Sequence, residues 1–112
     1  MWEVNGLKIE FDIEDLETAE KLDNALIELQ KAEKNVPKGT SMAESIKLYC
    51  KTLEDFFKSI FGDETTKQIF KGIKINQRLY DEIFMSFCAL VDEQKINREE
   101  RSKRFQRYVP KK

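Results

Sequence analysis

The first residues of the chain alternate between apolar and polar side chains. From Leu7 to Ile13 every second residue is apolar, which is typical of a β-strand with one buried face. Just before this run, Asn5 and Gly6 form the pair preferred in two-residue type I′ turns, where both positions need positive φ. We therefore predict a short β-hairpin over residues 2–13. A lone hairpin is marginally stable in water, so its apolar face is expected to pack against helices.

Downstream of the hairpin, apolar residues recur at three- and four-residue steps, the spacing of amphipathic helices. Pro37 disfavours helix at the residue before it, and Gly62 suits the end of a helix, so breaks are expected at both. The predicted helices run from Asp15 to about Asn35, from a cap at Ser41 or Thr40 to Phe61, from Glu64 to Lys71 after a cap at Asp63, and onward from a cap at Asn76.

Each long helix carries an apolar stripe that is expected to face a shared core. The first stripe contains Leu16, Ala19, Leu22, Leu26 and Leu29. The second contains Met42, Ile46, Tyr49, Cys50, Leu53, Phe56, Phe57, Ile60 and Phe61. The last contains Leu79, Tyr80, Ile83, Phe84, Phe87, Cys88, Leu90 and Val91. The predicted fold class is mainly α: a small helical bundle of three to four helices with a short N-terminal β-hairpin and a basic C-terminal tail.

Charge divides the chain into two parts. Residues 95–112 hold eight basic and two acidic side chains, hence a net charge of +6. The whole chain carries −1, so residues 1–94 carry −7. A chain of 112 residues is expected to form one domain. We predict a helical domain with the hairpin over residues 1–94 and a basic tail or helix extension over residues 95–112.

Three interpretations of the basic segment remain open. It is a solvated tail that pairs loosely with the acidic body, a docking segment for a protein partner, or a nucleic-acid contact. Arginines with aromatic residues are enriched at interface hot spots, so the predicted partner-binding residues are Arg98, Arg101, Arg104, Phe105, Arg107 and Tyr108. Nucleic acid ranks last, because the acidic body repels phosphates and the segment matches no known nucleic-acid module.

No catalytic or metal-binding constellation is visible in the sequence. The chain contains no histidine, the commonest general base, and its two cysteines supply half of a zinc site. We therefore expect no enzymatic activity, no cofactor and no metal. Cys50 and Cys88 lie within apolar stripes, which favours two buried thiols over a disulfide.

Two further expectations come from apolar residues. The chain has no apolar run approaching the ~18 residues of a membrane span and no basic-then-apolar start, so a cytoplasmic protein is expected. The phenylalanines, eight in all, are predicted to form the core rather than a cofactor site. If the other helices leave one helix face uncovered, the surplus apolar surface is expected to form a groove for a partner.

The layout of the chain resembles a known family. The two-strand start VNGLKIEFDI, the segment DFFKSIFGDETTKQIFKG and the basic end NREERSKRFQRYVPKK resemble small tail-module proteins of Gram-positive siphophages and prophages, the phage tail assembly chaperones. The resemblance implies a helical, non-enzymatic protein that binds the tape-measure protein in the cytoplasm of the bacterial host. It supplies no catalytic residues.

The resemblance leaves open how copies of the protein are arranged. Contact between the acidic body and the basic end would allow head-to-tail self-association along an elongated client.

Two alternative functions remain open. The first is a small nucleic-acid-associated or regulatory protein that acts through the basic tail, and the second is a structural component of the virion.

Overall fold

The computed structural model describes residues 1–109; the end of the predicted basic tail, residues 110–112, lies outside the described residues. The described residues form a two-stranded antiparallel sheet and four helices. The elements are β1 (Trp2–Val4), β2 (Leu7–Ile9), α1 (Leu16–Lys34), α2 (Met42–Phe61), α3 (Asp63–Ile69) and α4 (Gln77–Tyr108). The fold class predicted from the sequence is therefore confirmed.

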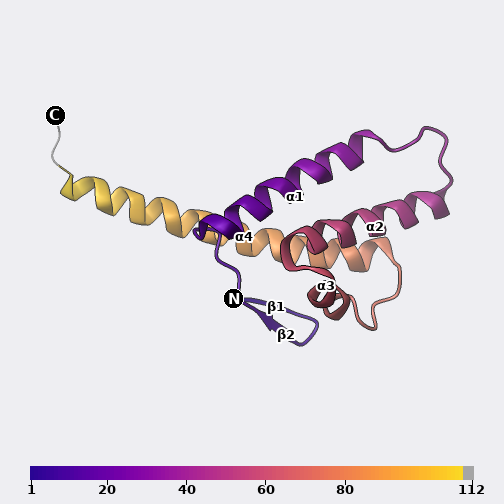
Figure 1. Cartoon of the computed structure of the whole chain (residues 1–112), viewed down its shortest axis with the longest axis horizontal. Helices are drawn as coiled ribbons and strands as arrows, with labels where there is room; N and C mark the ends of the chain where they lie inside the picture. The colour runs from indigo at the N-terminus through magenta and orange to yellow at the C-terminus, as the bar shows by residue number, and fades with distance from the viewer. Residues whose placement is uncertain (110–112) are drawn as a thin grey trace.

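The helices are arranged as a hairpin laid on a longer helix. Figure 1 shows α1 and α2 running antiparallel, α4 passing along α2, and α3 with the β-hairpin on the other side of α4. The second half of α4 projects beyond the other elements, and with it the molecule measures 59 × 34 × 21 Å. No helix within residues 1–109 combines the length and apolarity needed to cross a membrane.

The hairpin is shorter than the alternating sequence pattern predicts. Asn5 and Gly6 adopt φ values of 47° and 77°, as the predicted turn requires. Trp2 is the first strand residue and pairs with Ile9, so residues beyond Ile9 have no strand left to pair with. The expectation of a strand up to Ile13 is wrong for this reason. The alternation still marks the inner face, because Phe11 is buried in the core.

Side chains of the hairpin attach it to α3 and α4. The side-chain amide of Asn5 donates hydrogen bonds to the carbonyls at the end of α3, at 3.1 Å to Ile69 and 2.8 Å to Lys71. The indole N–H of Trp2 donates to the hydroxyl of Ser86 on α4 at 3.1 Å. The Asn5 bonds satisfy carbonyls that a helix end leaves unpaired, and together with the Trp2 bond they fix the hairpin on the bundle.

The core is largely aromatic. Trp2 stacks on Phe57, with ring centroids 5.4 Å apart, and Phe87 meets Trp2 edge-on at 5.2 Å. Of the eight phenylalanines, seven lie in this core or pack against it. The exception is Phe105, whose exposed fraction is 70%. The prediction that the phenylalanines form the core is thus confirmed for all but one.

The predicted buried face of α1 is confirmed at Ala19, Leu22 and Leu29, which are buried or partly buried, and is wrong at Leu16 and Leu26. Leu16 and Leu26 are 75% and 41% exposed, whereas Leu22 and Ala25 are the buried residues of this helix. The helix turns its small residues toward α2, and that rotation moves Leu26 to the rim. At the start of α2, Met42 is 81% exposed, because it lies beyond the helices that could cover it. The expectation of a buried thiol is met only in part at Cys88, which is half-buried.

Local capping signals worked at two helix starts and failed at one. The hydroxyl of Ser41 accepts a hydrogen bond from the N–H of Glu44, and the Asn76 side chain accepts one from the N–H of Leu79. Asp63 was expected to cap α3 but is its first helical residue. Gly62, at φ 85°, both ends α2 and precedes α3, so no separate capping position remains.

Candidate functional site

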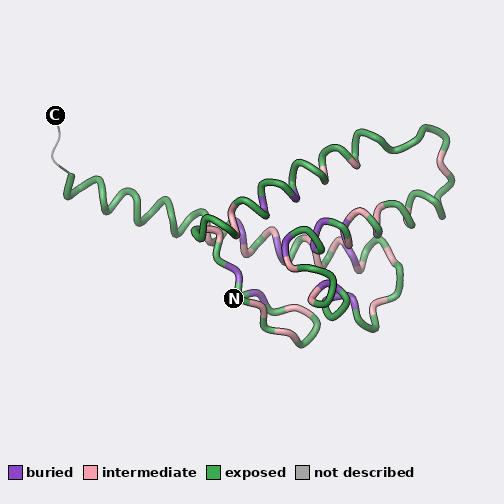
Figure 2. Tube along the Cα trace, viewed as in Figure 1, coloured by how far each residue is buried: buried purple, intermediate pink, exposed green. Residues whose placement is uncertain are grey.

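The predicted partner-binding residues all lie in the second half of α4. Residues 95–108, here called the α4 extension, continue the helix without a break, and every one of them is exposed. Figure 2 shows this exposed helix leaving the body. The six predicted partner-binding residues are Arg98, Arg101, Arg104, Phe105, Arg107 and Tyr108.

One face of the α4 extension continues the face that α4 buries in the core. Residues on this face follow alternating steps of four and three, the spacing that keeps side chains on one side of a helix. The body covers Tyr80, Phe84, Phe87, Val91 and Gln94. Beyond the body, the same face carries Arg98, Arg101, Phe105 and Tyr108.

The structure therefore divides the predicted set in two. Four of its residues share the face that continues the core stripe, Arg104 borders this face next to Tyr108, and Arg107 points to the opposite side of the helix. Phe105 and Tyr108 are the exposed aromatic residues of this face, at 70% and 86%. A core-type face whose large rings are exposed, with no cover from elsewhere in residues 1–109, is typical of an interface.

Two contacts fix the start of the α4 extension to the body. The side chain of Gln94 bonds to the backbone at Phe11 and Ile13, which holds the segment between β2 and α1 against α4. About two turns further along α4, Arg101 forms an ion pair with Glu14. Both partners of that pair are partly exposed, so it contributes little to stability and remains accessible to a protein partner.

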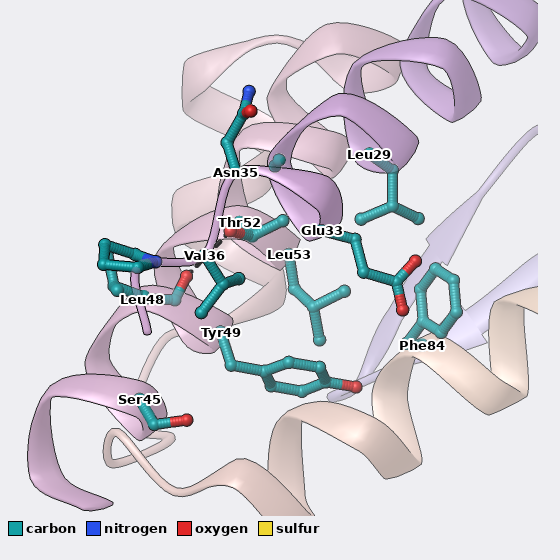
Figure 3. A pocket seen from close by; sticks show the side chains of 12 residues that line it. Leu29, Glu33, Asn35, Val36, Ser45, Leu48, Tyr49, Thr52, Leu53 and Phe84 are labelled. Atoms are coloured by element: carbon teal, nitrogen blue, oxygen red, sulfur yellow. Dashed lines mark hydrogen bonds between the residues drawn. The ribbon is translucent and has the colours of Figure 1, made fainter. Parts of the chain in front are cut away.

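A groove between α1 and α2 is the second candidate surface. Two adjoining cavities of about 440 and 210 Å³ form it, and here they are called the α1–α2 groove. Most of the lining is apolar, as the close view of the larger cavity shows (Figure 3). The side chains that line the larger cavity include Leu29, Val36, Leu48, Tyr49, Leu53 and Phe84.

The charged residues of the α1–α2 groove are all acidic. The carboxylates are Glu28, Glu33 and Asp55, and none of the described residues that line either cavity is a lysine or an arginine. Figure 3 shows Glu33 among the side chains that line the larger cavity. The groove therefore combines apolar walls with negative charge, which suits an apolar segment that carries cations.

Tyr49 forms the floor of the groove. Its hydroxyl donates a hydrogen bond to the carboxylate of Asp81 on α4. Burial, followed by this bond and the nearby carboxylates, raises the pKa of Tyr49 well above its usual range. The ring therefore remains neutral at physiological pH, where it links α2 to α4 and closes the base of the cavity.

One sequence pattern could have indicated the groove, namely the spacing of two alanines on α1. Ala25 and Ala32 lie seven residues apart on the face of α1 that meets α2, and both line the cavities. Small residues at this spacing leave room between two helices. A groove was expected only if a helix face stayed uncovered, and the sequence did not predict its position. Asp81 and Gln94 were missed as well, because their partners are distant in sequence.

Neither cysteine has the environment of a reactive thiol. Cys50 is 1% exposed, Cys88 is half-buried, and both are free. Burial raises the pKa of each thiol, with Glu54 adding to the effect at Cys50 and Asp92 at Cys88. Within residues 1–109 no group of three or more His, Cys, Asp or Glu side chains is arranged to hold a metal ion.

Comparison with known proteins gives one match. The family described as "Family of unknown function (DUF6673)" matches residues 5–112. No curated protein and no solved structure matches the chain. The matched residues include the hairpin turn, the α1–α2 groove and the α4 extension, so both candidate surfaces belong to the matched region.

Proposed function

The chain belongs to DUF6673, a family of unknown function, and we propose that it is a non-enzymatic binding protein, a phage tail assembly chaperone. Its client is the tape-measure protein, held during tail morphogenesis in the cytoplasm of the bacterial host. The resemblance of three sequence segments to that class supports the assignment, and so does a mainly helical fold with two unpartnered surfaces.

The observation that carries the proposal is the α1–α2 groove. Its walls run along α1 from Ala25 to Asn35 and along α2 from Ser45 to Ser59, or about 15 to 20 Å. That length accommodates a few turns of a client helix. Val36 and Leu48 at its edge are 49% and 40% exposed, so apolar surface is available to a partner. Grooves of this kind bind amphipathic helices by their apolar face.

The test begins with the neighbouring genes. A tube-protein gene upstream and a very long tape-measure gene downstream would support the proposal, and an unrelated neighbourhood would remove the support of the resemblance. The tape-measure protein encoded there is then co-expressed with the tagged chain. The wild type is expected to retain it through purification.

A matched pair of variants assigns the retention to the groove. Leu48→Arg places a cation in the apolar lining and should abolish retention. Ala43→Arg makes the same kind of change on α2 at an exposed position outside the lining, and it should retain the client. Equal retention by both variants would contradict binding in the groove.

One observation favours a nucleic-acid-associated function as the alternative. Basic side chains project from several sides of the α4 extension, including Arg98, Lys103 and Arg107. Cations on every side of an exposed helix contact phosphates without sequence preference. A gel shift with DNA that weakens steeply between low and moderate salt would favour this alternative. Presence of the chain in finished particles would instead favour a structural component of the virion.

A further inference from the structure

We propose that the α4 extension of one copy docks in the α1–α2 groove of a second copy, so that the protein self-associates head to tail. The contact needs no client and is a property of this chain alone. Its consequence for the client rests on the proposed function: a client helix and a neighbouring copy compete for the same groove.

Charge complementarity is the first argument. The extension carries Lys95, Arg98, Arg101, Lys103, Arg104 and Arg107 against two acidic residues, Glu99 and Glu100. The groove carries three carboxylates, and its described lining has no cation. Opposite charges on two exposed surfaces steer them together and set their register. The extension therefore fits this groove better than it fits the mixed charges on the outer side of α1.

Shape and chemistry match as well. The extension is about 20 Å long, similar to the length of the groove walls. Phe105 and Tyr108 lie one turn apart on the face that continues the core stripe, and they are the large apolar groups that need cover. A cavity of about 440 Å³ has room for such rings between apolar walls. Aromatic anchors in a pocket with arginines around them form a typical interface hot spot.

The groove of the same chain is out of reach. α4 is one unbroken helix from Gln77 to Tyr108, and it carries the extension away from the end where α1 and α2 are joined. Figure 1 shows the extension and the α1–α2 connection at opposite ends of the molecule. A straight helix cannot turn back without breaking its hydrogen bonds. The extension can therefore fill this groove only on another copy.

Pairing of two extensions with each other is disfavoured. Arg98 and Arg101 lie within the stripe that would form such a seam, and both helices carry a net positive charge. Like charges brought face to face cost free energy and suppress the wrong pairing. Contact between two different surfaces is heterologous, so copies add to one another as an open chain or a ring.

The test measures the mass of the purified chain by light scattering and sedimentation over a range of concentrations. The wild type is expected to self-associate. The double variant Phe105→Ala/Tyr108→Ala should weaken association about thirtyfold or more, as loss of a hot spot does. Ile96→Ala is the matched control, because Ile96 is an exposed apolar residue on another side of the same extension, and association should not change. A wild type that stays monomeric at high concentration would overturn the proposal.

Mixing two defective variants tests the head-to-tail geometry. Leu48→Arg blocks the groove and leaves the extension intact, whereas the double variant leaves the groove intact. Each is expected to be monomeric alone, and an equal mixture should form a dimer and nothing larger, because one working contact remains. If Leu48→Arg alone still associates, the extension pairs with itself or binds elsewhere, and the proposal is wrong.

The two proposals can fail separately. Self-association is measured without client, and retention of the tape-measure protein is measured by co-purification. Loss of client with intact self-association would overturn the proposed function alone. Retention of client by a chain that never self-associates would overturn this inference alone. If both hold, adding the tape-measure protein to the assembled chain should release copies from one another.

Discussion

The side-chain amide of Gln94 on α4 donates a hydrogen bond to the backbone carbonyl of Phe11 over 2.7 Å, across 83 positions of sequence. The amide oxygen of the same side chain accepts a bond from the N–H of Ile13 at 2.9 Å. One side chain thus satisfies two backbone groups of the segment between β2 and α1. It lies where the covered part of α4 ends and the α4 extension begins.

Replacing Gln94 is expected to weaken the whole fold. Gln94→Ala leaves a partly buried N–H and carbonyl unpaired and should lower the free energy of unfolding by about 1–3 kcal/mol. Urea denaturation followed by circular dichroism measures the change. Gln106→Ala, at an exposed position on the same helix, is the control and should stay within about 0.5 kcal/mol of wild type. Similar effects of both changes would show that the Gln94 bonds contribute nothing.

Two phenylalanines should differ sharply in their effect on stability. Phe57 is fully buried among aromatic rings, so Phe57→Ala leaves a cavity and should cost about 3–5 kcal/mol. Phe105 is 70% exposed, so Phe105→Ala should change stability by less than about 0.5 kcal/mol. Thermal unfolding of dilute samples measures both without interference from self-association. A large loss in Phe105→Ala would mean that its ring packs within its own chain.

The fold should lose stability in alkaline solution. Burial, with Glu54 as the next cause, raises the pKa of Tyr80 from 10.0 to about 12, and the pKa of Tyr49 is also raised. The unfolded chain releases these protons at lower pH than the folded chain, so rising pH favours unfolding. The contribution is complete below pH 10.0 and declines between pH 10.0 and about 12.

Denaturant midpoints at several pH values check this expectation. Tyr80→Phe removes one of the groups with a raised pKa and keeps the ring that stacks on Phe70 at 4.4 Å. The decline with pH should therefore be shallower in this variant than in the wild type. A midpoint that stays constant from about pH 9 to about pH 11 would contradict the assignment of neutral buried tyrosines.

The cysteines should react with a thiol reagent in a fixed order. Cys88 is half-buried and Cys50 is 1% exposed, and burial raises the pKa of both thiols. Reaction of the native chain should be slow at Cys88 and slower still at Cys50, since the thiolate is the reactive form. Mass spectrometry after timed alkylation assigns each site. In denaturant the two rates should converge, and Cys50 reacting first in the native state would contradict the packing of α2.

Local signals predicted most of the elements. The apolar periods, the Asn5-Gly6 turn and the caps at Ser41 and Asn76 depend on residues a few positions apart, and the structure confirms them. The end of β2 was predicted wrongly because β2 can be only as long as its partner strand, and few residues precede the turn. The cap of α3 was predicted wrongly because Gly62 is both the residue that ends α2 and the residue that precedes α3.

The candidate site was predicted in part. The composition of the basic segment singled out its arginines and aromatics, but it did not show which of them share a face with the core stripe. The groove was not located, because it depends on the rotation of α1 that turns Ala25 and Ala32 toward α2. The period of α1 allowed Leu26 to be chosen instead, and periodicity alone cannot separate adjacent faces of one helix.

The sequence by itself determined that this chain is a small, mainly helical domain with an N-terminal hairpin and a basic end. Periodicity, capping and charge are properties of neighbouring residues, so they can be read without knowing the fold. Only the tertiary structure decided that the stripe of α4 continues past its cover to Phe105 and Tyr108, and that α1 and α2 leave an acidic groove between them. Those features arise where distant segments meet, and packing between whole helices sets them.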